Sequence, residues 1–91
     1  MSPSAQWAAA AQTYRLTADT VATLHEGGIL SDEAIVAMSG PMTEAYEALM
    51  MAEALLDTED DAAIRKTELV LQMIRSVRRR LYADTGQELD Q

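Results

Sequence analysis

The sequence predicts an all-α fold, a three-helix bundle with up-down-up antiparallel order. The 91 residues are 48% hydrophobic and include four Gly and two Pro, which suits a single helical domain. Apolar side chains recur at spacings of three and four residues in three separate segments. Short connections between these segments favour antiparallel neighbours. We expect one domain over residues 1–86, with helices at about 3–26, 32–57 and 59–84, and a frayed acidic tail at 87–91.

The first helix is predicted from a start signal, an apolar stripe and a stop signal. Ser2 is a favourable N-cap, and Pro3 suits the first helical position. Gly27-Gly28 ends the helix, because one of these glycines adopts the left-handed C′ conformation easily. The stripe expected to face the core consists of Trp7, Ala11, Tyr14, Ala18, Val21 and His25, widened by Ala10, Thr17 and Leu24.

The second helix is predicted to begin after the N-cap Ser31 and to contain a proline. Its apolar positions keep one rhythm on both sides of Ser39-Gly40-Pro41, whereas a true loop would reset the phase. We therefore expect one helix, kinked where Pro41 loses its hydrogen bond to Ala37. Two shorter helices, broken at Gly40-Pro41, are the alternative. The stripe consists of Ile35, Met38, Met42, Ala45, Leu49, Ala52 and Leu56.

The third helix is predicted from a capping pattern and an amphipathic sequence. Thr58 followed by Asp61 resembles a capping box, and the acids around them complement the positive end of the helix dipole. Arginines gather toward the other end, which the dipole also favours, and Gly86 is a late stop signal. The apolar arc expected to face the core consists of Ile64, Val70, Leu71, Ile74, Val77 and Leu81.

Residues 57–68, with the sequence DTEDDAAIRKTE, also fit the spacing of a twelve-residue calcium loop. Acids fall at the first, third and fifth positions, and Glu68 falls at the bidentate twelfth. The segment thus resembles the loop of the EF-hand family, and the resemblance implies a calcium ligand set made of Asp57, Glu59, Asp61 and Glu68. Ala62 stands where that loop uses Gly for its sharp turn. A capped helix start explains the same acids, and we prefer it to a calcium binder.

The second helix carries more apolar surface than a three-helix monomer is expected to bury. Residues 49–56, LMMAEALL, are apolar nearly all round, and Val36 lies off the main stripe. Met50, Met51 and Leu55 are unable to face the two neighbouring helices all at once. We therefore predict association through this helix, with Val36, Met50, Met51 and Leu55 as the partner-binding residues. The expected partner is a second copy of the chain, giving a homodimer, or a larger protein with a basic rim.

The net charge of −8 is divided unevenly along the chain. Residues 1–64 hold eleven acids and one base, whereas residues 65–82 hold six bases and one acid. The acidic majority repels phosphate at long range, so nucleic acid is disfavoured as a partner. The alternative function uses the C-terminal arginines, with Arg75 and Arg79 as candidate anion-binding residues. In that case the protein is a regulator that contacts nucleic acid or another anionic partner.

The sequence contains no recognised catalytic or metal-binding motif. Cysteine is absent, His25 is the only histidine, and neither a Gly-rich phosphate loop nor a nucleophile motif is present. We therefore expect no cofactor and no bound metal. The lack of cysteine fits a reducing compartment, and no apolar run is long enough to cross a membrane, so we expect a cytoplasmic protein. The prediction is a non-enzymatic, acidic interaction module that serves as an adaptor, inhibitor or regulator.

Overall fold

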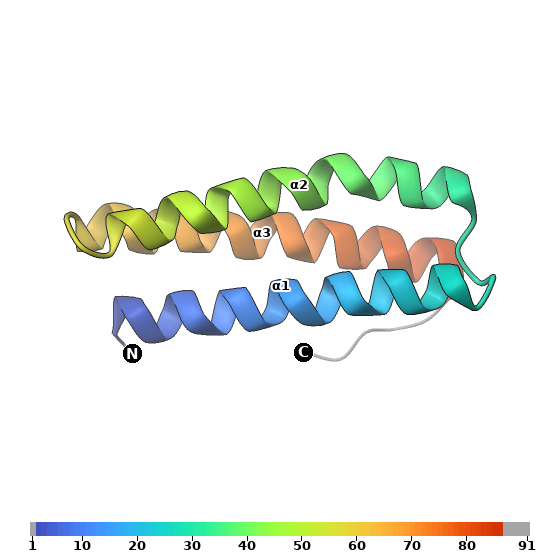
Figure 1. The fold of residues 1–91 in the computed structure, drawn as a ribbon, viewed down its shortest axis with the longest axis horizontal. Coiled ribbons are helices and arrows are strands. Elements are labelled where there is room, and N and C mark those ends of the chain that lie inside the picture. Colours follow the sequence, from blue (N-terminus) through green and yellow to red (C-terminus); the bar gives the residue numbers. More distant parts are fainter. Residues whose placement is uncertain (1, 87–91) are drawn as a thin grey trace.

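The computed structural model describes residues 2–86 and contains three helices (Figure 1). They are α1 (Pro3–Glu26), α2 (Asp32–Leu55) and α3 (Asp60–Thr85). All three pack against one another, α1 and α3 run in one direction, and α2 runs in the other (Figure 1). The predicted all-α three-helix bundle is therefore confirmed, and each helix begins and ends within two residues of its predicted bounds. The predicted frayed tail at 87–91 lies outside the described residues.

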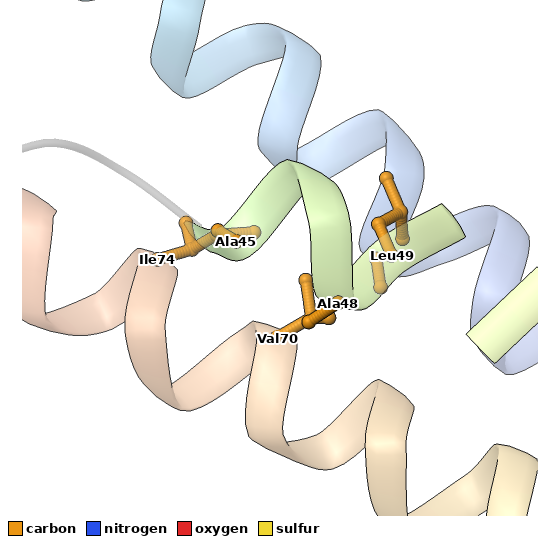
Figure 2. Packing of buried hydrophobic residues seen from close by; sticks show 6 residues of the cluster. Ala45, Ala48, Leu49, Val70 and Ile74 are labelled. Carbon is orange, nitrogen blue, oxygen red and sulfur yellow. The ribbon is translucent and has the colours of Figure 1, made fainter. Parts of the chain in front are cut away.

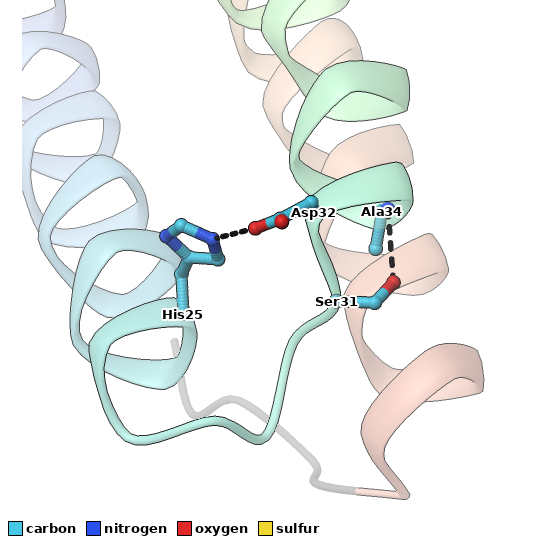
Figure 3. Close-up of polar contacts among 4 residues, drawn as sticks. All are labelled: His25, Ser31, Asp32 and Ala34. Carbon is cyan, nitrogen blue, oxygen red and sulfur yellow. Dashed lines mark hydrogen bonds and ion pairs between the residues drawn. The ribbon is translucent and has the colours of Figure 1, made fainter.

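Four of the predicted end signals form as expected, and one of them is Gly86, which ends α3 in the left-handed conformation with φ 73°. The Ser2 hydroxyl accepts a hydrogen bond from the Ala5 amide at 3.1 Å, which caps α1. Ser31 caps α2 in the same way, accepting from the Ala34 amide at 3.2 Å (Figure 3). After α1, Gly28 adopts the left-handed conformation with φ 77°, which lets the chain turn back toward α2. These local signals place the ends of α1, the start of α2 and the end of α3.

The predicted cap of α3 is wrong. Helix α3 begins at Asp60, and its N-cap Glu59 makes no side-chain capping bond. Thr58 instead belongs to the turn that closes α2, where the amides of Thr58 and Glu59 both donate to the Leu55 carbonyl, at 3.1 and 2.8 Å. The Leu55 carbonyl at the end of α2 thus accepts the Thr58 amide, which a capping box would have bonded to the Asp61 carboxylate.

Helix α2 is continuous through Pro41, so the alternative of two shorter helices is wrong. Pro41 is exposed at a shallow hollow beside Val77 and Arg80 of α3, and its missing amide removes one helical hydrogen bond. In the turn before it, the Ser39 hydroxyl donates to the Val36 carbonyl at 2.9 Å, adding a bond where the helix is weakened. A kink at this point stays a prediction.

The centre of the bundle is a close contact between α2 and α3. Its core cluster consists of Ala10, Ala45, Ala48, Leu49, Val70 and Ile74. Figure 2 shows Ala45 near Ile74 and Ala48 near Val70, so small side chains of α2 meet branched side chains of α3. The alternation of small and large residues fills the space between the two helices. A second cluster at the other end consists of Leu24, Leu30, Met38, Met42, Val77 and Leu81.

Helix α1 is rotated relative to the prediction. Its fully buried side chains are Ala10, Thr17 and Leu24, which the prediction placed at the margin of the stripe, whereas the six central stripe residues from Trp7 to His25 are only half-buried. The reason is that α1 packs more extensively against α3 than against α2. The predicted stripe therefore lies along the boundary with α2, where part of each side chain still meets solvent.

Replacing Ala45 with Leu is expected to lower the free energy of unfolding by about 1–3 kcal/mol, because a larger side chain forces α2 away from α3. Urea denaturation measures the change. The matched control is Ala54→Leu, which adds the same atoms at an exposed position of α2 and is expected to change stability by less than about 0.5 kcal/mol. Equal effects of the two substitutions would show that the close α2–α3 contact does not limit stability.

Candidate functional site

Two of the four predicted partner-binding residues lie on the surface of α2. Val36 is 72% exposed and Met51 is 56% exposed. Met50 and Leu55 are half-buried, and Met50 packs against the first core cluster. The monomer therefore accommodates more of the apolar surface of α2 than the sequence indicates. Val36 and Met51 remain as large apolar side chains in contact with solvent.

Val36 and Met51 occupy one outer face of α2. Fifteen residues separate them, which corresponds to about 22 Å along the helix and about 60° around it. Thr43 and Glu47 are exposed on the same face between them. We call this surface, made of Val36, Thr43, Glu47 and Met51, the outer face of α2. On this face the apolar side chains of Val36 and Met51 are separated by the polar side chains of Thr43 and Glu47.

The structure also exposes apolar residues that the sequence reasoning missed. Tyr46 is 49% exposed, and its ring centroid lies 5.9 Å from that of Tyr14 on α1. Tyr46 precedes Met50 by one helical turn, so the same projection that selected Met50 would have found it. The other exposed large apolar side chains are Leu16, Ile29, Leu69 and Tyr82. They come from α1, from the connection that follows it and from α3, so the surplus is not confined to α2.

An apolar hollow of about 180 Å³ lies between α1 and α2. It is lined by Tyr14, Ala18 and Val21 of α1 and by Ile35, Met38, Ser39 and Met42 of α2. We call it the α1–α2 groove. The Tyr14–Tyr46 ring contact marks one end. Beyond its other end, His25 Nε2 lies 2.7 Å from Asp32 Oδ1 and joins the end of α1 to the start of α2 (Figure 3).

The two helices that line the α1–α2 groove are strongly acidic. Their only base is Arg15, and every one of their acids is exposed. Within residues 2–86, the one close contact of these acids with a basic side chain is the hydrogen bond between Asp32 and His25. The remaining acidic side chains therefore present uncompensated negative charge to solvent. The acids are Asp19, Glu26, Asp32, Glu33, Glu44, Glu47 and Glu53.

The C-terminal arginines have different environments and do not act as one patch. Arg75 and Arg79, the predicted anion-binding pair, are both exposed one helical turn apart on α3. Arg78 is half-buried, and its Nε is enclosed without a hydrogen-bond partner among the described residues. Arg80 lies 3.8 Å from Asp84 in an ion pair. The guanidinium groups of the predicted pair, Arg75 and Arg79, are therefore both accessible from solvent.

The calcium resemblance does not extend to the backbone. Residues 60–68 belong to α3, so most of the twelve-residue segment is helical. Ala62, at the position where a calcium loop turns sharply, lies within that helix. Asp57 and Glu59 precede the helix, whereas Asp61 and Glu68 lie within it. The structure does not form the loop that the resemblance implies.

Tyr14, at the end of the α1–α2 groove, has a perturbed acidity. Burial raises the pKa of Tyr14 above its ordinary value of 10.0, and repulsion from the nearby Tyr46 phenolate raises this pKa further. Both causes disfavour the charged form of the Tyr14 hydroxyl. The shift reports how far the α1–α2 boundary covers this side chain.

An alkaline titration followed by tyrosine absorbance is expected to show a late phase that disappears in Tyr14→Phe. In the folded protein Tyr14 keeps its proton at a pH where the unfolded chain has lost it, so the unfolded state binds fewer protons in this window. The free energy of unfolding therefore falls as the pH rises from about 10 through the folded pKa of Tyr14, and it falls less in Tyr14→Phe. Tyr82→Phe, an exposed position on α3, is the control. A late phase that persists in Tyr14→Phe would assign it to another residue.

In residues 2–86 no group of three or more His, Cys, Asp or Glu side chains is placed to hold a metal ion. No helix in that range is both long enough and apolar enough to pass through a membrane. Comparisons with protein-family models, with curated proteins and with solved structures find no match for this chain.

Proposed function

We propose that this protein is a non-enzymatic interaction module that binds another protein through the outer face of α2. The supporting observation is the exposure of Val36 and Met51, at 72% and 56%, on one face of one helix. Fully covering an exposed aliphatic or methionine side chain contributes about 1.5–3 kcal/mol, so two such anchors favour association appreciably. Met51 adds a flexible side chain that adapts to the shape of its partner.

The charge around the outer face favours a partner with a basic rim. Glu33, Glu44 and Glu47 are exposed on or beside this face of α2. A symmetric homodimer through the same face would bring these carboxylates against their own copies, which is unfavourable. A larger protein with Lys or Arg around an apolar pocket would gain attraction and a faster encounter. We therefore prefer such a partner to self-association.

The proposed role is that of an adaptor, inhibitor or regulator in the cytoplasm. A three-helix bundle with two exposed apolar anchors suits docking onto another protein. The lack of cysteine in the sequence fits a reducing compartment. The partner's identity decides which of these roles applies.

Capture from a lysate of the source cells, followed by mass spectrometry, tests the proposal. The double variant Val36→Glu, Met51→Glu is expected to recover at least about tenfold less of any partner than the unmodified chain, because two apolar anchors become charged. The matched control, Gln72→Glu, adds negative charge at an exposed position of α3 and is expected to recover the partner normally. Recovery that is equal for all three proteins would reject the outer face of α2 as the docking surface.

A second candidate function rests on the exposure of Arg75 and Arg79. Here the protein would contact nucleic acid or another anionic partner through these two guanidinium groups. The double variant Arg75→Glu, Arg79→Glu would then abolish the interaction, and added salt would weaken binding by the unmodified chain steeply. Binding measured by fluorescence anisotropy across a salt series distinguishes the two candidates. Weak salt dependence together with full binding by this variant would exclude the second one.

A further inference from the structure

The α1–α2 groove leaves uncovered a stripe with the pattern of a core-facing surface. Tyr14, Ala18 and Val21 follow the three/four rhythm of an interior helix face, and Ile35 does so on α2. All four are only half-buried, because α1 packs mainly against α3. An additional helix laid along the boundary would cover this stripe and extend the bundle from three helices to four.

The dimensions of the groove suit side chains of a helix better than a small molecule. Its volume of about 180 Å³ lies below the range of about 300–1,000 Å³ that is usual for small-molecule pockets. Its lining residues run from Tyr14 to Val21 on α1 and from Ile35 to Met42 on α2, seven residues or about 10 Å along each helix. That length matches two turns of a helix, which present apolar side chains at the i, i+4 and i+7 positions. Ala18 adds little bulk and permits close approach.

The charge of α1 and α2 identifies the chemistry of the occupant. These helices carry seven exposed acids and one base, Arg15. A second copy of the chain docking through the same surface would place the two acidic surfaces against each other. A helix with Lys or Arg flanking its apolar stripe would meet charges of opposite sign.

We propose that the α1–α2 groove binds a cationic amphipathic helix of a partner protein. This inference rests on the proposed function as an interaction module, and it places a second contact on that module beside the outer face of α2. Apolar side chains of the partner helix fill the space between Tyr14, Ala18 and Ile35. Its basic residues meet the net negative charge of α1 and α2, whose acids are exposed outside the groove lining.

Binding of a labelled synthetic helix to the full chain tests this inference. The probe is a peptide of about 18 residues made of Leu, Lys and Ala, with Leu at the i, i+4 and i+7 positions. Fluorescence anisotropy is expected to show binding that weakens with added salt. A peptide of the same composition with its Leu positions scrambled is expected to bind at least about tenfold more weakly. Equal binding of the two peptides would overturn the inference, because it would reduce the interaction to charge attraction.

The variant Ala18→Met tests the location, because its longer side chain occupies the groove itself. It is expected to weaken peptide binding at least about tenfold, with unchanged circular dichroism. The matched control Ala9→Met makes the same change at an exposed position of α1 and is expected to bind normally. Unchanged binding by Ala18→Met would overturn the inference. So would a homodimer, seen by sedimentation, that dissociates in Ala18→Met, because the occupant would then be a second copy.

The variant of the outer face separates this inference from the proposed function. If peptide binding survives Ala18→Met and is lost in Val36→Glu, Met51→Glu, the groove inference fails and the proposed function stands. If the peptide does not bind the unmodified chain at all, the groove inference fails. The lysate capture then tests the proposed function independently.

Discussion

The close contact of α2 with α3 is the constraint on which the rest of the structure depends. Ala45 and Ala48 of α2 lie against Val70 and Ile74 of α3, so the helices meet through small side chains on one side and branched ones on the other. This pair leaves α1 to pack as the third element, and α1 buries Ala10, Thr17 and Leu24 while contacting α3 more extensively than α2. The geometry of one helix pair thereby determines where the third leaves apolar surface open.

Helix α1 is joined to α2 by separate contacts along its length, with the groove between them. Near its start, the Trp7 indole N–H donates to the Leu49 carbonyl at 2.8 Å. The Tyr14–Tyr46 ring contact follows near the middle, and the hydrogen bond between His25 and Asp32 lies at the end. Such contacts fix the separation of two helices without requiring continuous packing between them. The groove is consequently a feature of the folded monomer, bounded by residues whose contacts are polar or aromatic.

The candidate site could be predicted only in part from the sequence. A helical projection shows that Val36 and Met51 lie away from the main stripe, and both are exposed. It does not show that Met50 would find space against the first core cluster, because that space depends on how far α1 stands from α2. The groove was beyond prediction for the same reason. Its lining residues have the pattern of an ordinary core, and only the position of α1 leaves them half-covered.

The sequence by itself determined the helices, most of their ends and the continuity of α2 through Pro41, because hydrogen bonding, capping and periodicity act over a few residues. Tertiary structure decided the rotation of α1, the partial burial of Met50 and the place where α3 begins. Each of these depends on competition between neighbours. Helices α3 and α2 compete for the apolar face of α1, and the Leu55 carbonyl takes the Thr58 amide that a capping box would bond to the Asp61 carboxylate. Sequence periodicity and capping signals do not predict the result of that competition, because the result depends on the distances between the helices.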